Sequence, residues 1–491
     1  MKRPVKTALL FMTYSLLIAM ISPTGHTAPN EKDVRAAMKK ATDYMMNTVS
    51  CRGGFVWKYS EDLSKRWGEV PARESQIWVQ GATNGVGEML IDAYEITGER
   101  EYLDYAKNVA NALIWGQHPA GGWHYFIDFD MTGIRKYYEE VASQCWGWEE
   151  YYHYYGNCTF DDDTTTSSIR FLMRLYMMTL DPAYYQPLIK ALGFVLESQF
   201  PNGAWPQRYP LMYDHVKNGK PDYTSFYTFN DGVMWNNIMV LLDAYEKLGN
   251  EEYYKAARRG MDFYIISQYG KPQAGWSAQH SHDMTPTHAR SYEPEGVWSG
   301  STLNNINNLY DFYRITGDRK YLAPVPAALE WLENSYVKDD PAGNYTHARV
   351  YQLGTNKPLY SHREGTNIKN GRYYQDHTFG NFVCHYGQAA RIDVPDHKKV
   401  FERVNALTPE QALTEYERKK ANKKVLPDVK SEEVESIIKS LNSNGAWIED
   451  ISISNFVNPC ADNRRGTTVR GISTRTYISN MKKMIGFMEK Q

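Results

Sequence analysis

A repeated unit of roughly 70 residues most constrains the fold of this chain. Its copies run over residues 90–123, 171–207, 239–276 and 308–345. Each copy contains two segments with a helical pattern of apolar residues. The first segment ends near a turn that contains Gly or Asp, and the second begins at a Tyr. In the first copy Tyr102, Ala106, Val109 and Leu113 are three or four residues apart, which indicates an amphipathic helix. Because helical hairpins bury their apolar faces against neighbouring hairpins, the sequence predicts an all-α fold, an incomplete (α/α) toroid with long loops at one end.

A Gly-Trp or Ala-Trp pair closes three of the copies, at Trp123, Trp205 and Trp276, and weaker versions occur near both ends of the chain. Such a tryptophan can pack the base of a loop, or it can line the loop end and stack on a sugar ring. Both interpretations stay open at this level. Trp205 is the candidate for substrate contact.

The two ends of the chain read differently from the repeats. Residues 1–28 combine a basic start, a short apolar run and a small residue, Ala28, which predicts a signal peptide and a secreted, periplasmic or extracellular protein. Residues 29–390 are predicted to form the toroid, and residues 391–491 a small C-terminal extension that packs on it. The net charge is −2, and nothing in it suggests a nucleic-acid partner. After cleavage we expect no membrane association, and a monomer.

Five cysteines follow no zinc-binding spacing. Cys145 and Cys158 flank a Tyr-rich loop and could form a disulfide in an oxidising compartment.

Three consecutive carboxylates, Asp161, Asp162 and Asp163, precede an apolar helical run in "TFDDDTTTSSIRFL". Asp163 could be an N-cap, but a cap accounts for one aspartate and not for three. Carboxylates held close together repel unless a cation or a base neutralises them, and hard oxygen ligands favour calcium. "YTFNDGVMWNN" repeats the layout with Asp231. We therefore expect Asp161 to Asp163 and Asp231 at the same end of the toroid.

The loops of the next two copies carry basic residues at the corresponding places. "THARSYEPEG" supplies Arg290 and Glu293, and "THARVYQLGTNKPLYSHREG" supplies Arg349, Lys357 and Arg363. Alone, each arginine is more often a surface or structural ion pair. Together with the acidic loops they predict a mouth with cation ligands on one side and carboxylate-binding arginines on the other. A polyanionic sugar chain bridged by calcium would suit such a mouth.

Several of these motifs resemble polysaccharide lyase family 10, the pectate lyases with an (α/α)3 toroid. They are "DDDTTTSSIRFLMRL", "FPNGAWPQRYP", "FYTFND", "HARSYEPEGVWSG" and "ARVYQLGTNKPLY", and the similarity spans residues 53–386. The resemblance implies calcium-assisted β-elimination on polygalacturonate, which leaves 4,5-unsaturated oligosaccharides.

The resemblance also implies roles for single residues. Asp161 matches the calcium-site aspartate, Asp231 the acid of the TFND motif, and Arg290 the arginine taken as the Brønsted base. Arg349 and Arg363 match arginines that bind substrate carboxylates. The chain departs from the family pattern in three places. Asp162 stands where Asn is frequent, Lys357 stands where Arg is common, and "SHRE" at Arg363 replaces a more usual Arg-Asp pair.

Two other functions fit the same residues. A glycoside hydrolase on an α/α toroid could use Asp161 and Asp231 as its acid and base. A non-catalytic polyuronate-binding protein would use the aromatic loops without turnover.

Overall fold

The computed structural model describes residues 29–144, 149–213, 215, 220–337, 340, 342–364, 372–383, 385–422, 426–453 and 468–490. The predicted signal peptide, residues 1–28, lies outside the described residues, as does Cys145, whereas Cys158 is a buried free thiol. Within the described part of the chain, no helix is both long and apolar enough to cross a membrane.

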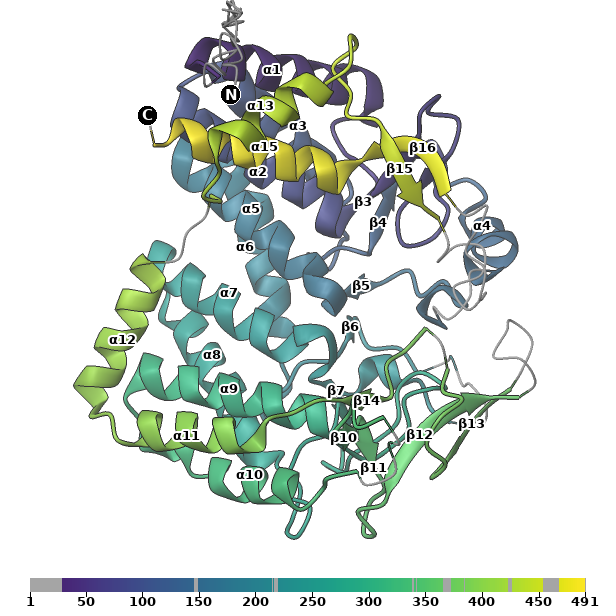
Figure 1. The fold of residues 1–491 in the computed structure, drawn as a ribbon, viewed down its shortest axis with the longest axis vertical. Helices are drawn as coiled ribbons and strands as arrows, with labels where there is room; N and C mark the ends of the chain where they lie inside the picture. Colours follow the sequence, from purple (N-terminus) through teal and green to yellow (C-terminus); the bar gives the residue numbers. More distant parts are fainter. Residues whose placement is uncertain are drawn as a thin grey trace, which may run out of the picture.

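Helical hairpins form the body of the molecule, as predicted. The first helices are α2 (Asn84–Thr97), α5 (Thr164–Thr179), α7 (Val233–Leu248) and α9 (Ser299–Thr316). Their partners are α3 (Arg100–Trp115), α6 (Pro182–Glu197), α8 (Glu251–Ile266) and α10 (Val325–Glu333). Helix α2 packs on α5, and α5 packs on α7, so the hairpins stand side by side in an arc (Figure 1).

Short strands gather at one end of the helices, on the right in Figure 1. Two-stranded pairs join β3 (Gln76–Trp78) to β4 (Phe126–Asp128), β5 (Cys158–Thr159) to β6 (Arg208–Tyr209), β7 (Tyr227–Thr228) to β8 (Gln279–His280), and β10 (His347–Ala348) to β14 (Ala389–Ala390). A four-stranded sheet runs in the order β13 (Tyr373–Asp376), β12 (Pro358–Arg363), β11 (Val350–Tyr351), β9 (Val297–Trp298). The long loops therefore lie at one end of the arc, as predicted.

The tryptophans that close the repeats act as helix caps. Each indole N–H donates to a carbonyl in the last turn of the preceding helix, a group that the helix itself leaves without a partner. The pairs are Trp123 to Leu113, Trp205 to Val195 and Trp276 to Tyr264, each at 2.8 Å, and Trp447 to Ile437 at 2.9 Å. Trp205 is 0% exposed. The prediction that Trp205 contacts substrate is therefore wrong, because its ring lies wholly in the core.

Glycines of the same repeats set the distance between neighbouring hairpins. Gly203 has φ +96°, and a Cβ there would lie 2.1 Å from the carbonyl oxygen of Arg259 on α8. Gly445 has φ +93°, and its Cβ would lie 2.5 Å from the carbonyl oxygen of Lys40 on α1 (Glu31–Tyr44). Only a residue without a side chain allows this approach. The loop near the end of the chain thus packs on its first helix as one repeat packs on the next.

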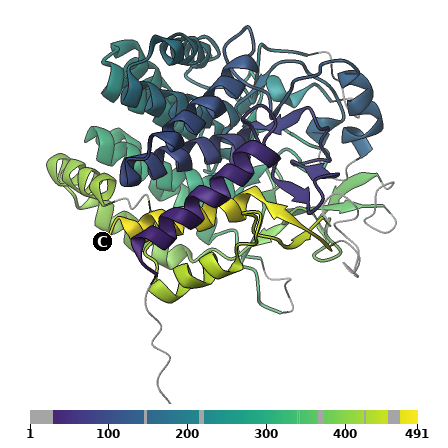
Figure 2. The same cartoon turned by 90° about the horizontal axis from the view of Figure 1, so that it is seen from above.

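Residues 391–491, predicted to pack on the toroid, divide between its two ends. Helices α11 (Val394–Asn405) and α12 (Pro409–Ala421) cover α10 and α9, whereas α13 (Ser431–Ser440) and α15 (Thr474–Met488) join α1 and α2. Figure 2 shows α1 lying across α15. A sheet in the order β15 (Glu449–Ser452), β16 (Thr468–Ser473), β1 (Lys58–Ser60), β2 (Arg66–Trp67) fixes the same end, with Lys58 opposite Ser473.

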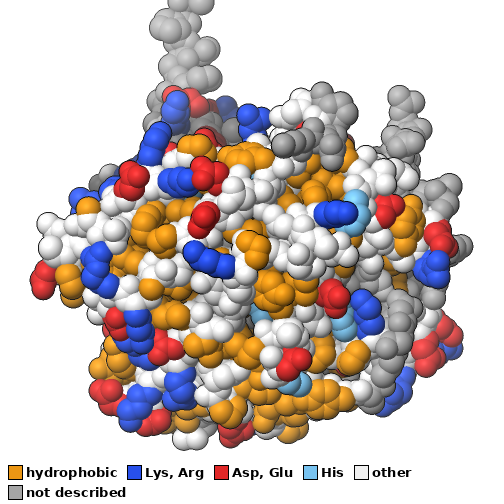
Figure 3. Space-filling model, turned by 90° about the horizontal axis from the view of Figure 1, so that it is seen from below, with side chains coloured by type: hydrophobic (Ala, Val, Ile, Leu, Met, Phe, Trp, Pro, Cys, Tyr) orange, Lys and Arg blue, Asp and Glu red, His pale blue; other side chains and the backbone are white. Residues whose placement is uncertain are grey.

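The remaining elements are short helices. They are η1 (Met45–Val49), η2 (Val79–Thr83), α4 (Ile134–Glu140), η3 (Ala142–Gln144), η4 (Glu149–Tyr151), η5 (Asp161–Asp163), η6 (Tyr223–Ser225), η7 (Asn230–Gly232) and η8 (Arg319–Leu322). On the face seen from below, described side chains of both charges are interspersed with apolar ones (Figure 3).

Candidate active site

Two single-turn helices bring the predicted acidic loops together. Strand β5 leads into η5 and then α5, and strand β7 leads into η7 and then α7, so the two loops have the same layout. Asp162 and Asp231 both adopt left-handed backbone conformations, with φ 50° and 48°. Such conformations are uncommon outside glycine and cluster at functional sites. Carboxylate oxygens of Asp161, Asp162 and Asp231 all lie within 4.8 Å of one another. These three residues are called the carboxylate triad below.

Asp163 does not join the triad, although it was predicted as a metal ligand. Its carboxylate lies 2.8 Å from the guanidinium of Arg170 and accepts a hydrogen bond from Thr166, both on α5. Asp163 is itself left-handed, with φ 61°, and this second turn directs its side chain back over the helix. The prediction for Asp163 is therefore wrong.

Arg290 is buried against the triad and against two glutamates. Its Nη2 lies 3.4 Å from Asp161 Oδ2 and 3.8 Å from Asp231 Oδ2. Its Nε lies 3.0 Å from Glu150, and its Nη1 lies 3.3 Å from Glu293. Burial lowers the pKa of Arg290, but the charges of Glu150 and Glu293 outweigh it and raise the pKa well above its usual range. The guanidinium is thus a fixed cation in this arrangement.

Glu293 holds Arg290 in place. It is 0% exposed, and it accepts hydrogen bonds from the Arg290 backbone N–H at 3.0 Å and from the Tyr386 hydroxyl at 2.5 Å. Glu293 also lines a hollow beside Arg290, so its contact with substrate stays a prediction. It is a positioning residue for Arg290.

The sequence analysis missed three groups of this site. Tyr125 donates its hydroxyl to Asp161 Oδ2 at 2.5 Å, and Glu150 is 3% exposed beside Arg290. Glu69 accepts from the Tyr151 hydroxyl at 2.8 Å, and burial together with the charge of Glu150 raises the pKa of Glu69 well above its usual range. Glu69 precedes the first copy of the repeat and Tyr125 follows it, so a comparison of the copies points to neither residue. The acidic pair at Glu150 was the one available signal.

The triad fits a divalent cation. Asp161 is 1% exposed, and its Oδ1 is buried without a hydrogen-bond partner. Burial of the Asp162 carboxyl and the nearby negative charge of Asp161 raise the pKa of Asp162 to about 7. The same two causes raise the pKa of Asp231 well above its usual range. A hard cation such as calcium would neutralise the excess negative charge of the triad. It would also take the unpartnered carboxylate oxygen as a ligand.

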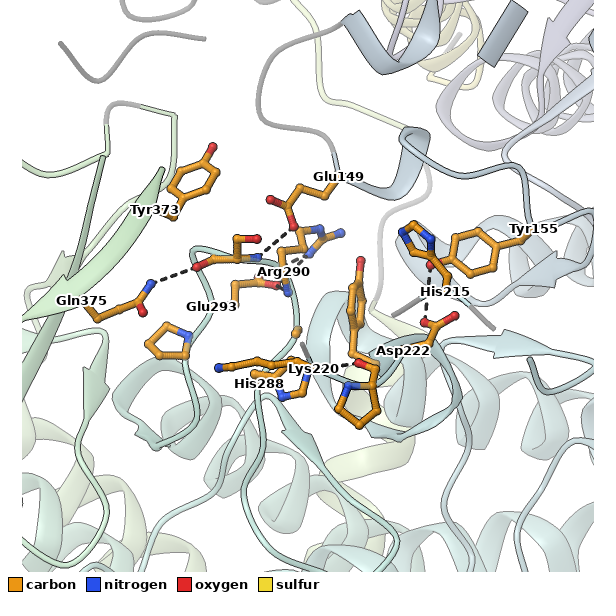
Figure 4. Close-up of a pocket in the computed structure, with 15 residues that line it drawn as sticks. Glu149, Tyr155, His215, Lys220, Asp222, His288, Arg290, Glu293, Tyr373 and Gln375 are labelled. Atoms are coloured by element: carbon orange, nitrogen blue, oxygen red, sulfur yellow. Dashed lines mark hydrogen bonds and ion pairs between the residues drawn. The ribbon is translucent and has the colours of Figure 1, made fainter. Parts of the chain in front are cut away.

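A hollow of about 140 Å³ lies on another side of Arg290 (Figure 4). Glu149, Lys220, His288, Tyr373 and Gln375 are among the side chains that line it. It combines both signs of charge with an aromatic ring, so it can bind a polar, charged ligand next to Arg290.

Neither predicted substrate arginine is among the described residues that line this hollow, but each contacts an aromatic ring close to it. Arg363 stands opposite Tyr373 in the β12–β13 ladder, and its guanidinium lies 4.7 Å from the centre of that ring. Arg349 lies over the ring of Tyr386 at 4.1 Å, and Tyr386 in turn bonds Glu293.

Lys357 lies at the opposite end of β12 from Arg363. It is an exposed residue that directly precedes β12, whereas Arg363 ends the strand. Six residues of extended chain span roughly 20 Å. The structure therefore separates Lys357 from Arg363.

Comparison with known proteins agrees with this site. The pectic acid lyase family model matches residues 149–375, a segment that contains the triad, Arg290 and Arg363. The match confirms the resemblance that the motifs indicated. This family match supports a polysaccharide lyase. More particularly, the chain is a pectate lyase-like enzyme.

Solved structures with similar folds include a family 10 polysaccharide lyase from Cellvibrio cellulosa. It is 20% identical, covers 66% of this chain and 98% of its own, and has a TM-score of 0.43. A variant of that enzyme was solved in complex with trigalacturonic acid, with the same scores. An α-1,6-mannanase from Salegentibacter is 12% identical, covers 93% of this chain and 98% of its own, and has a TM-score of 0.37. No curated protein matches the sequence.

Proposed function

We propose that this chain is a secreted pectate lyase that cleaves polygalacturonate or a related polyuronate by calcium-assisted β-elimination. The observation that carries the proposal is the meeting of Asp161, Asp231 and Arg290, which come from three different loops. The pectic acid lyase match over residues 149–375 supports the substrate class. Residues 1–28 would direct export of the protein, which would act as a monomer.

Asp161, Asp162 and Asp231 would hold the calcium ion. When bound, calcium would draw electron density from a uronate carboxylate and so acidify the proton on C5. Arg363 and Arg349 would pair with other carboxylates of the chain, since guanidinium groups bind carboxylates in two parallel hydrogen bonds.

Elimination removes the C5 proton and breaks the bond from C4 to the bridging oxygen, which takes up a proton from water and leaves as a hydroxyl. A C4–C5 double bond remains. Arg290 is the predicted base, and it lies beside the triad where that proton would be presented. Its raised pKa opposes a neutral guanidinium while Glu150 and Glu293 are charged. Arg290 can also stabilise the negative charge that develops on the uronate carboxylate, a task that needs the cation. Its role as base stays a prediction.

The test is an assay on polygalacturonate with calcium and with excess chelator. We expect absorbance of the unsaturated uronate to rise with calcium and to stop with chelator. New reducing ends without a double bond would instead identify a hydrolase that uses Asp161 and Asp231. Tight binding without any product would identify a polyuronate-binding protein.

A further inference from the structure

Helix α9 carries an unusual run of amides. Asn304, Asn305, Asn307 and Asn308 lie in its interior, although asparagine is among the poorer helix formers and favours caps and turns. None of the four occupies the N-cap, which is Trp298. Residues that oppose the helix preference of their own segment often belong to a functional site.

These amides line a cavity of about 390 Å³ between α9 and the start of α7. The volume lies within the range of sites that bind small molecules. Asn305 is 3% exposed and lines the cavity, yet its Nδ2 has no hydrogen-bond partner. Asn308 donates to the Tyr264 hydroxyl at 3.2 Å. The cavity therefore holds a buried donor that no described protein group satisfies.

The lining selects for an uncharged, hydroxyl-rich ligand. Each asparagine amide offers donors and an acceptor together, the combination that sugar hydroxyls require. Trp235 adds an aromatic surface, on which the apolar face of a sugar ring can pack. None of the described residues that line the cavity is Lys, Arg or His, and Asp231 lies at its edge. A carboxylate away from the Asp231 edge would find no cationic side chain among the described lining residues.

Asp231 belongs both to the cavity and to the carboxylate triad. A sugar in the cavity would therefore sit next to a uronate held at the triad. We propose that the asparagine-lined cavity binds a neutral sugar unit adjacent to the uronate that reacts. The preferred substrate is then a heteropolymer in which uronate neighbours an uncharged sugar, rather than polygalacturonate alone. This inference rests on the proposed function.

The substrate test compares polygalacturonate with a polymer that alternates galacturonate and rhamnose, both with calcium. For the unaltered enzyme we expect kcat/KM to be about tenfold higher on the alternating polymer, because galacturonate in the cavity would bury a carboxylate without a cationic partner. In the variant with Asn304→Ala and Asn307→Ala we expect this ratio to fall toward one.

Both substituted positions are exposed on α9, and alanine is the better helix former. We therefore expect an unchanged or higher melting temperature, so that a lost preference cannot come from misfolding. Asn111→Ala, at an exposed position of α3 outside the cavity, is the matched control and should keep the ratio.

The outcomes separate this inference from the proposed function. Equal or lower activity on the alternating polymer, or a ratio that the double variant leaves unchanged, would overturn the neutral-sugar site while the lyase stands. If neither polymer yields unsaturated product, calorimetry with the alternating tetrasaccharide decides. Weaker binding by the double variant than by the unaltered protein would support the sugar site without the lyase, and equal binding would overturn the site.

Discussion

Nη2 of Arg290 lies 3.4 Å from Oδ2 of Asp161, although the two residues are 129 positions apart in the chain. The same nitrogen lies 3.8 Å from Asp231. Acidic and basic loops of three repeats thus share one site. Since a cation bound by the triad would lie close to Arg290, the chemistry of each depends on the other.

Replacing Arg290 should reduce both activity and stability. Arg290→Gln leaves Glu150, Glu293 and Asp161 buried without their cation, and we expect a loss of about 3–5 kcal/mol in the free energy of unfolding. Loss of charge stabilisation should lower kcat by roughly 100-fold or more. Urea unfolding and the absorbance assay measure the two effects. Adding Glu150→Gln should recover part of the stability but not the activity, and additive losses of stability would argue against the pairing.

Substitution of Asp162 should lower the affinity for calcium much more than substitution of Asp163. Asp162→Asn removes a triad carboxylate and should weaken calcium binding by roughly tenfold or more. Asp163→Asn breaks the pair with Arg170, outside the triad, and should change calcium affinity by less than about twofold. Isothermal titration calorimetry compares them. Equal losses in the two variants would place the metal elsewhere.

Trp205→Phe should affect stability and not substrate binding. It removes the indole donor to the carbonyl of Val195, which keeps the hydroxyl of Ser198 at 3.2 Å as a donor. We therefore expect a loss of about 0.5–1.5 kcal/mol, whereas KM should stay as it is. Trp447→Phe removes the equivalent cap on Ile437 and serves as the control. A KM that rises for Trp205→Phe but not for Trp447→Phe would show that Trp205 contributes to substrate binding.

Substitution of Arg363 should weaken substrate binding, whereas substitution of Lys357 should not. Arg363→Ala removes a guanidinium beside the hollow, and we expect KM to rise by about tenfold, the value of one charge-assisted hydrogen-bond pair. Lys357→Ala changes an exposed residue at the far end of β12 and should leave KM unchanged. Steady-state kinetics on polyuronate of fixed length gives both values, and a larger effect at Lys357 would contradict the arrangement.

His280 should make the fold sensitive to acid. Burial lowers the pKa of His280 from 6.5 to about 4, and the side chain is 0% exposed. Above pH 6.5 this histidine is neutral in both states. Between pH 6.5 and 4 the unfolded chain gains a proton that the folded protein does not, so stability falls with pH by up to about 3 kcal/mol.

His280→Phe should flatten this part of the profile, because the ring already packs edge-on against Phe229. Thermal melts from pH 7 to pH 4 measure the slope. A profile for His280→Phe that parallels the unaltered protein would assign the acid sensitivity to other groups.

The sequence by itself determined the repeat, the helical hairpins and the equivalence of the Asp161 and Asp231 loops. These features follow from the helical period and from local turns, so neighbouring residues suffice to define them. The sequence also placed Arg290 in the correct loop, because the repeat puts corresponding loops at the same end.

Only the tertiary structure decided which side chains meet. Spacing along the chain does not give the direction of a side chain in an irregular loop, and two successive left-handed residues turned Asp163 toward Arg170 instead of the triad. Glu69 and Glu150 belong to the site because loops that are distant in sequence pack together. Trp205 lies in the core, where its indole N–H donates to the carbonyl of Val195. Lys357 and Arg363 belong to one motif, yet an extended strand holds them at its opposite ends.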